Sequence, residues 1–187
     1  AIVTNIEWDH PDFFKTPEAF HHAFEQFIAL LPEDGQVIFC ADDPGALQLR
    51  YRFREELSVW GYGARNSGEW LAKEISPEGG GTSFNLVKNG HLELICNVHL
   101  RVPGHVNVLN AVAAIRASQQ LGIQPEAAAK ALATFNGVGR RFDTLGEIGN
   151  IAVIDDYAHN PAKIRAVLEA ARSRYPDRHI WAIWQPH

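Results

Sequence analysis

The sequence predicts an α/β fold in which a mostly parallel sheet continues into an antiparallel meander. Three observations predict it. Short apolar runs alternate with helical patterns near both ends of the chain, as in βα units. Between residues 70 and 98, three runs alternate apolar and polar residues, which is typical of antiparallel strands. The composition is that of a globular protein, with 46% of the 187 residues hydrophobic and 21% charged.

The first elements follow from apolar runs and helix-start signals. Residues 1–6 and 36–41 are predicted to be strands. Thr16-Pro17-Glu18 supplies a capping hydroxyl, a proline for the first turn and an acid for the positive end of a helix. An apolar stripe at helical spacing, expected to face the core, consists of Phe20, Ala23, Phe24, Phe27, Ile28 and Leu31. Asp42-Asp43 opens a helix near residues 44–55, either as its cap or as a ligand contact.

The middle of the chain changes from helical spacing to alternation. A short strand is expected over 59–62, and the meander is expected to consist of strands 70–75, 83–88 and 91–98. Asn89-Gly90 predicts a two-residue hairpin turn. Gly79-Gly80-Gly81 predicts a flexible loop, because no lysine and hydroxyl follow it as in a phosphate-binding loop. Helices are then predicted over 105–121 and 125–134.

Charge and cysteine content exclude several classes of protein. The net charge is −5, and no basic block indicates a nucleic-acid surface. No apolar run is long enough to span a bilayer, and no signal peptide is seen, so a cytoplasmic protein is expected. Cys40 and Cys96 lie in apolar runs and are predicted to be small buried hydrophobes. Both termini fall inside strand-like runs, so a fragment of a longer protein is expected.

A domain junction is predicted at Phe135 to Phe142, where two glycines precede two arginines. It would separate residues 1–136 from residues 137–187. In the second part, strands are expected over 142–145 and 151–155, a helix over 161–174 and a strand over 179–184. The last three elements would form the first βαβ unit of a Rossmann-like domain.

The stretch from Asp155 to Pro161 is the strongest candidate site. Two carboxylates, a phenol and an imidazole, from Asp155, Asp156, Tyr157 and His159, lie where a strand ends and a helix begins. In open α/β sheets this edge is where ligands usually bind. The alternative is that an aspartate ends the strand and Asn160 caps the helix.

Three further candidates precede it in the chain, each with an alternative. Asp9-His10 at a strand end suits a hard metal whose other ligands are water and phosphate, or else a hydrogen-bonded loop. Asn107 and Asn110 face one side of a helix and offer carboxamides to a purine edge, unless the first is a cap and the second exposed. Arg140-Arg141 could clamp a phosphate or be an exposed basic pair.

Four segments together resemble a known family. They are Thr4 to Asp12, Gly104 to Asn110, Gly137 to Phe142 and Asp155 to Pro161, and their order and spacing are similar to those of the Mur ligases. These ATP-dependent ligases build the peptide of bacterial peptidoglycan. The resemblance covers essentially the whole chain. It is strongest to the members that join L-alanine to UDP-N-acetylmuramate, on the segments Gly139 to Asp143, Asp155 to His159 and Trp184 to His187.

The resemblance implies a fold and a reaction. Residues 1–136 would be the later part of the central ATP-binding domain, and residues 137–187 the start of the C-terminal domain that binds the amino acid. ATP and Mg²⁺ would be the cofactors, and UDP-N-acetylmuramate and L-alanine the substrates. The substrate carboxylate would be phosphorylated, and the amino acid would then attack the acyl phosphate. No nucleic-acid or membrane partner is implied, and the oligomeric state is not indicated.

The resemblance also assigns roles to residues. It places His10 on magnesium and Asn107 and Asn110 on adenine. Arg141 would approach the phosphates and Asp156 the ribose. The incoming amino acid and the acyl phosphate would lie near Tyr157 and His159.

The sequence departs from the family pattern in several places, and two alternatives accompany these roles. The family's phosphate-binding loop is absent from the 187 residues, so this chain alone is predicted to be inactive. One alternative is the family member that recycles murein tripeptide, against which Trp184-Gln185-Pro186-His187 argues. The other is a nucleotide-binding module without catalysis.

Overall fold

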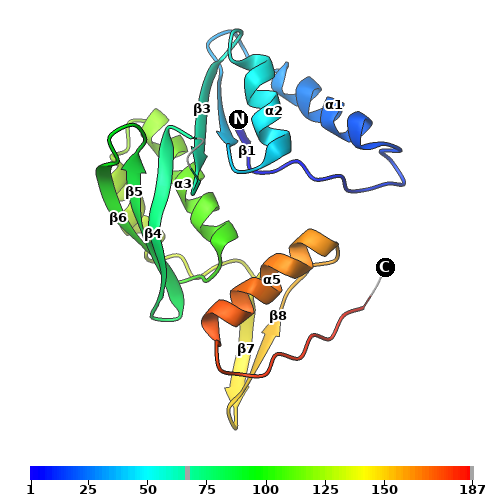
Figure 1. The fold of residues 1–187 in the computed structure, drawn as a ribbon, viewed down its shortest axis with the longest axis vertical. Coiled ribbons are helices and arrows are strands. Elements are labelled where there is room, and N and C mark those ends of the chain that lie inside the picture. Colours follow the sequence, from blue (N-terminus) through cyan, green and yellow to red (C-terminus); the bar gives the residue numbers. More distant parts are fainter. Residues whose placement is uncertain (66–67, 186–187) are drawn as a thin grey trace.

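A computed structural model describes residues 1–65 and 68–185. A six-stranded sheet has the order β1-β2-β3-β4-β5-β6, and a separate two-stranded sheet lies beside it (Figure 1). Neighbours pair in parallel from β1 to β4 and antiparallel from β4 to β6, which confirms the predicted fold class. The strands of the large sheet are β1 (Ile2–Val3), β2 (Gln36–Cys40), β3 (Ser58–Gly63), β4 (Trp70–Glu78), β5 (Gly81–Lys88) and β6 (Glu93–Leu100).

Helices cover both faces of this sheet. They are α1 (Pro17–Ile28), α2 (Pro44–Phe53), α3 (His105–Gln120) and α4 (Pro125–Leu132). Successive side chains of a strand point to opposite faces, so β2 contributes to two cores. Val37 and Phe39 pack with α1 and α2, whereas Ile38 and Cys40 pack with α3 and α4. The result is a three-layer arrangement with the sheet in the middle.

The helix starts form as predicted. Thr16 Oγ1 accepts a hydrogen bond from Ala19 N at 3.2 Å and caps α1. Asp43 Oδ1 accepts from Ala46 N at 2.8 Å and caps α2. Asp42 accepts instead from Ala64 N at 2.6 Å. Both aspartates are therefore occupied by backbone groups.

The apolar stripe on α1 is narrower than predicted. Ile28 is fully buried, but the neighbouring Phe27 is 50% exposed. Phe20 and Phe24 meet edge to face, with ring centroids 5.3 Å apart. Because α1 covers only one edge of the sheet, one side of the helix has nothing to pack against in the part of the chain that the structure describes.

The first strand is shorter than the predicted span of residues 1–6. β1 pairs only with β2, at Ile2↔Ile38 and Val3↔Phe39, and then ends. Beyond this point Ile6 N donates to Asp43 Oδ1 at 3.0 Å, so the chain is held by a helix cap instead of a neighbouring strand.

The two glycine-containing turns of the meander both differ from their predictions: the tight two-residue turn lies at Gly79-Gly80, not at Asn89-Gly90. Gly79-Gly80 forms the two-residue turn between Glu78 and Gly81, and both turn residues have positive φ, at 57° and 81°. The turn after β5 has four residues, because Lys88 pairs with Glu93. Asn89 does not open a two-residue turn, since its side chain donates to Gly68 O at 2.8 Å. The glycines of β4–β5 supply the backbone angles that the tighter turn requires.

The second sheet contains β7 (Asp143–Ile148) and β8 (Ile151–Asp155), which precede α5 (Pro161–Arg174). The two strands pair as predicted, and their orientation is antiparallel. The predicted strand over 179–184 is wrong, because residues 179–185 form no strand. Trp181 and Ile183 in this segment are 89% and 99% exposed. An apolar run becomes a strand only beside a hydrogen-bonding neighbour, and the described residues place none there. The predicted βαβ unit therefore consists here of β8 and α5 alone.

The remaining sequence expectations concern the cysteines and membrane spans. Cys40 and Cys96 are both buried free thiols, as predicted, and burial raises the pKa of each. None of the helices within residues 1–65 and 68–185 combines the length and apolar character needed to cross a bilayer.

Candidate functional site

The loop from Asp155 to Asn160 is fixed by hydrogen bonds to the junction that precedes β7. Asp156 Oδ2 accepts from Phe142 N and Asp156 Oδ1 from Ala158 N, each at 2.8 Å. Tyr157 N donates to Arg140 O at 3.0 Å. Both oxygens of Asp156 thus hold backbone groups, and its predicted role near a ribose stays a prediction.

Arg140, Tyr157 and His159 form a group of side chains at this loop. The rings of Tyr157 and His159 meet edge to face with centroids 5.1 Å apart. The Arg140 guanidinium lies 5.0 Å from the Tyr157 ring centroid, and its Nε lies 3.6 Å from Asp155 Oδ2. Such a cation over an aromatic face contributes about 0.5–1 kcal/mol at an exposed site.

The two arginines of the junction therefore differ. Sequence reasoning selected Arg141, but the first arginine is the one that contacts the loop. Arg141 is exposed, and its backbone N–H donates to Val138 O at 3.1 Å. Arg140 and Phe142 have positive φ, at 59° and 51°, so the chain turns sharply around Arg141. The sequence could not predict which arginine contacts the loop, because this depends on the direction in which the backbone turns.

Lys163 joins the loop to the N-terminal part of the chain. Its Nζ lies 3.0 Å from Asp9 Oδ2 and 3.2 Å from His159 Nε2. Asn160, which caps α5 through its Oδ1, also donates from Nδ2 to Asp9 Oδ2 at 3.1 Å. Sequence reasoning missed Lys163. The available signal was its position in the first turn of the predicted helix, close to His159 in the sequence.

The Lys163 ammonium lowers the pKa of Asp9 from its ordinary value of 3.8 to about 2, with help from hydrogen bonds of His10 N and Asn160. A carboxylate whose pKa is depressed in the folded state stabilises the fold above its unfolded-state pKa. That contribution disappears as the pH falls through the folded-state pKa. The stabilising effect of Asp9 is thus full near neutral pH and is lost between about pH 4 and pH 2.

Replacing Asp9 by asparagine is accordingly expected to destabilise the protein at neutral pH and to have little effect near pH 2. The measurement is urea unfolding of both proteins across this pH range. Asp12→Asn is the matched control, because Asp12 lies in the same exposed loop. A difference between wild type and Asp9→Asn that stays constant with pH would contradict the ion pair.

His10 is placed next to this bridge. It is exposed, with φ at 55°, and its carbonyl oxygen accepts from Phe13 N and Phe14 N at 3.0 and 2.9 Å. No three His, Cys, Asp or Glu side chains converge as a ligand set within residues 1–65 and 68–185. Magnesium prefers oxygen ligands and keeps several waters, and the Asp9 carboxylate beside His10 already accepts from Lys163 Nζ, Asn160 Nδ2 and His10 N. The role of His10 on magnesium stays a prediction.

The two asparagines lie at the start of α3. Asn107 Nδ2 donates to Pro103 O at 2.7 Å, so its amide nitrogen holds the preceding loop. Asn110 is exposed one turn further on. Asn110 is thus the more accessible of the two carboxamides, and the adenine contact predicted for the pair is not tested by this arrangement.

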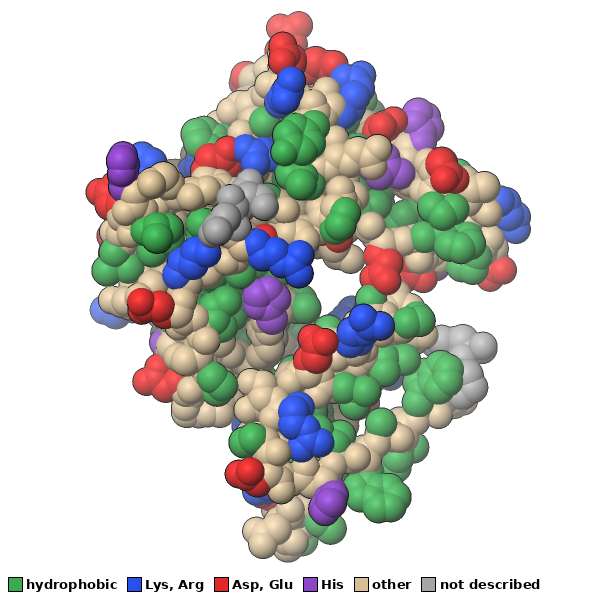
Figure 2. Space-filling model, viewed as in Figure 1, with side chains coloured by type: hydrophobic (Ala, Val, Ile, Leu, Met, Phe, Trp, Pro, Cys, Tyr) green, Lys and Arg blue, Asp and Glu red, His purple; other side chains and the backbone are tan. Residues whose placement is uncertain are grey.

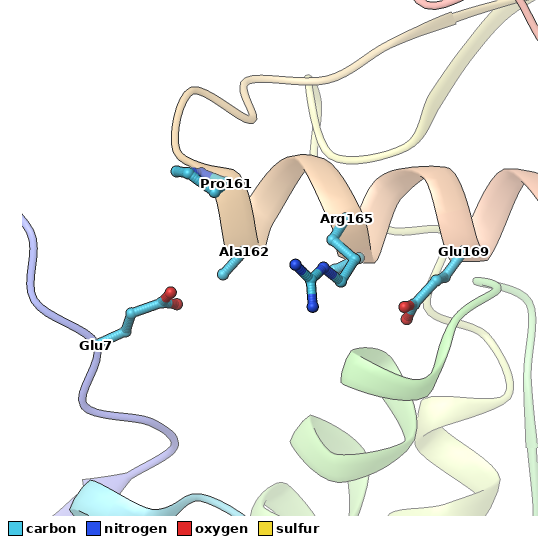
Figure 3. A pocket seen from close by; sticks show the side chains of 6 residues that line it. Glu7, Pro161, Ala162, Arg165 and Glu169 are labelled. Atoms are coloured by element: carbon cyan, nitrogen blue, oxygen red, sulfur yellow. The ribbon is translucent and has the colours of Figure 1, made fainter.

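A cavity of about 220 Å³ lies between the N-terminal segment and α5. Figure 3 shows Glu7 facing the first turn of α5, with Arg165 and Glu169 further along the same helix. In Figure 2 the surface is hollowed in this region, with charged side chains of both signs at its edge. The cavity is smaller than a typical ligand pocket of about 300–1,000 Å³. Among the described residues that line it there is no predicted site residue.

The fold alone does not assign a function. A sheet with helices on both faces is followed by a two-stranded sheet and a helix, and side chains from the two parts meet where Lys163 contacts Asp9. Such α/β arrangements host many unrelated functions.

Comparison with known families identifies the class. The Mur ligase middle domain matches residues 1–118, and the Mur ligase, glutamate ligase domain matches residues 140–186. The chain belongs to the Mur ligase family, as its motifs indicated. The matched ranges leave the predicted boundary at residues 136 and 137 as a prediction.

Several relatives carry specific names. The chain is 43% identical over 189 residues to the UDP-N-acetylmuramate–L-alanine ligase of Acetivibrio thermocellus, covering 100% of this chain and 39% of that protein. The UDP-N-acetylmuramate–alanine ligase of Thermotoga maritima has a similar structure, with a TM-score of 0.75, 30% identity, and coverage of 94% and 38%. A murein peptide ligase of Psychrobacter arcticus has a TM-score of 0.65 at 28% identity, with coverage of 100% and 38%. The chain spans about two fifths of the length of these relatives.

Proposed function

We propose that this chain is part of an ATP- and Mg²⁺-dependent ligase that joins L-alanine to UDP-N-acetylmuramate in the cytoplasm. The observation that carries the proposal is the contact of Lys163 with both Asp9 and His159. It brings the loop with Tyr157 and His159 to the segment that contains His10. The 43% identity to a named L-alanine ligase supports the choice of substrates.

The proposed reaction has two steps. A carboxylate oxygen of UDP-N-acetylmuramate attacks the γ-phosphorus of ATP, and the bond from that phosphorus to the β–γ bridging oxygen breaks, giving an acyl phosphate and ADP. The amine of L-alanine then attacks the acyl carbon, and a tetrahedral intermediate collapses to the amide and inorganic phosphate. The amine loses a proton in this step. When bound, Mg²⁺ supplies positive charge to the phosphates.

The residues of this chain would bind and orient the reactants. Asn107 and Asn110 would hydrogen-bond to the adenine edge, and the Arg141 guanidinium would donate to the phosphates. Asp156 would approach the ribose from the loop that it already holds. Tyr157 and His159 present a hydroxyl and an imidazole to the amino acid, and His10 would be a protein ligand of the metal.

The test is an assay of the complete gene product with ATP, UDP-N-acetylmuramate and one amino component at a time. L-Alanine, glycine, L-serine and murein tripeptide are compared by ADP and phosphate release. We expect the highest kcat/KM with L-alanine. A preference for tripeptide would favour the recycling ligase, and ATP binding without turnover would favour a nucleotide-binding module.

A further inference from the structure

The Lys163 side chain lies between an acid and an imidazole that are 150 residues apart in the chain. Its Nζ is 3.0 Å from Asp9 Oδ2 and 3.2 Å from His159 Nε2. The side chains of Lys163 and Asp9 are 36% and 22% exposed. Lys163 lies in the first turn of α5, and His159 lies just before Asn160, the N-cap residue of this helix.

The donors and acceptors around His159 determine its tautomer. Nδ1 lies 2.9 Å from Tyr157 O, and a carbonyl oxygen only accepts hydrogen bonds, so Nδ1 carries the ring proton. An ammonium only donates, so Nε2 offers its lone pair to Lys163. These two contacts orient the ring with Nδ1 toward Tyr157 O and Nε2 toward Lys163 Nζ.

The ammonium is itself held in place. Asp9 Oδ2 accepts from Lys163 Nζ and from Asn160 Nδ2, and Asp9 Oδ1 accepts from His10 N at 2.9 Å. The carboxylate is therefore fixed by groups on both sides of the domain boundary. An exposed ion pair between two mobile side chains would contribute little, but three donors converging on one carboxylate restrict its geometry.

We propose that Lys163 is a positioning residue that fixes the orientation and tautomer of His159 and ties it to Asp9. The proposal rests on the proposed function only where it concerns turnover. Within the ligase reaction, Lys163 would keep the His159 ring in a fixed orientation beside the segment with His10, where the acyl phosphate would form.

The first measurement is the reactivity of His159 toward diethyl pyrocarbonate in the complete gene product. The unprotonated ring nitrogen attacks a carbonyl carbon of the reagent, an N–C bond forms, and the anhydride C–O bond breaks. The ethyl carbonate that leaves takes up the proton lost by the ring and decomposes to carbon dioxide and ethanol. Peptide mass spectrometry reports the rate at each histidine. We expect Lys163→Met to raise the rate at His159 roughly tenfold, because the charge-assisted hydrogen bond from Lys163 to Nε2 is removed.

Two variants make the result specific. Lys163→Arg keeps a cationic donor and is expected to keep the rate at His159 low. Lys130→Met, on the exposed face of α4, removes a lysine elsewhere and is expected to leave the rate unchanged. The rates at His91 and His105 serve as internal references, and circular dichroism checks that each variant is folded.

An unchanged rate in Lys163→Met would overturn the proposal, as would equal increases in Lys163→Met and Lys163→Arg. Turnover separates this proposal from the proposed function. We expect Lys163→Met to lower kcat more than it raises KM for L-alanine, with partial recovery in Lys163→Arg. If the labelling rates change as expected but neither Lys163→Met nor His159→Gln affects kcat, positioning stands and the role of His159 in the ligase reaction fails.

Discussion

Replacement of Arg141 by alanine in the complete protein is expected to lower kcat and kcat/KM together by about 10²–10³-fold. The side chain is exposed, and it makes no hydrogen bond or ion pair within the residues that the structure describes. The backbone around it is held by its own N–H to Val138 O and by Phe142 N to Asp156 Oδ2. The backbone of Arg141 is therefore held in a fixed turn, and its guanidinium does not contribute to the stability of the fold.

Arg141→Lys keeps the charge but loses the forked set of donors, so it is also expected to be impaired. Arg140→Ala is the matched control, because it removes the adjacent arginine and its contacts with Asp155 and Tyr157. The measurements are steady-state kinetics and thermal unfolding of all three variants. Stability of Arg141→Ala should remain within about 0.5 kcal/mol of wild type, as for other surface changes. Normal turnover with a lowered Tm would show instead that Arg141 supports the fold.

Features that depend on neighbours in sequence were predictable. Thr16 and Asp43 cap α1 and α2 because their oxygens reach backbone N–H groups three residues ahead, and this spacing is visible in the sequence. Asn160 caps α5 for the same reason. The alternation of β4 to β6 likewise predicted an antiparallel meander, because it reflects one buried face.

Features that depend on a pairing partner far away in the sequence could not be predicted. Residues 179–184 have the apolar pattern of a strand but no pairing partner among the described residues. β1 stops at Val3, and beyond it Ile6 N bonds to the Asp43 cap. The assignment of the two-residue turn to Asn89-Gly90 failed because Asn89 bonds to Gly68 across the sheet. A local signal is necessary for such elements, but pairing decides them.

The candidate site also has one part that the sequence predicts and one part that it does not. The loop from Asp155 to His159 could be found from the sequence, because a strand end and a helix start coincide there. Its link to Asp9 through Lys163 could not, since 154 residues separate the two. Of the C-terminal motif Trp184 to His187, the last two residues lie outside the described residues.

A different part of the fold provides the largest expected effect on stability. Gly81→Ala is expected to destabilise the protein by about 3 kcal/mol or more. A Cβ at Gly81 would lie 1.8 Å from Leu100 O, 2.8 Å from Leu100 C and 2.9 Å from Arg101 C. All three atoms belong to the backbone. Relief would require β6 to move away from β5, which breaks the pairing of Thr82 with Leu100.

Alanine substitutions at two other glycines are controls that distinguish this steric clash from the other effects of adding a methyl group. Gly79→Ala, in the adjacent turn, meets no atom within 4 Å but must keep a φ of 57°, so it should cost about 1–2 kcal/mol. Gly146→Ala meets open space without a positive φ and should be near neutral. Urea unfolding followed by tryptophan fluorescence measures the three, with Trp70 of β4 as a buried reporter. Equal urea midpoints for Gly81→Ala and Gly146→Ala would contradict the prediction, because they would mean that the hairpin shifts without a loss of unfolding free energy. Because Arg174 of α5 donates to Gly80 O at 2.8 Å, a displaced hairpin should also loosen its contact with α5.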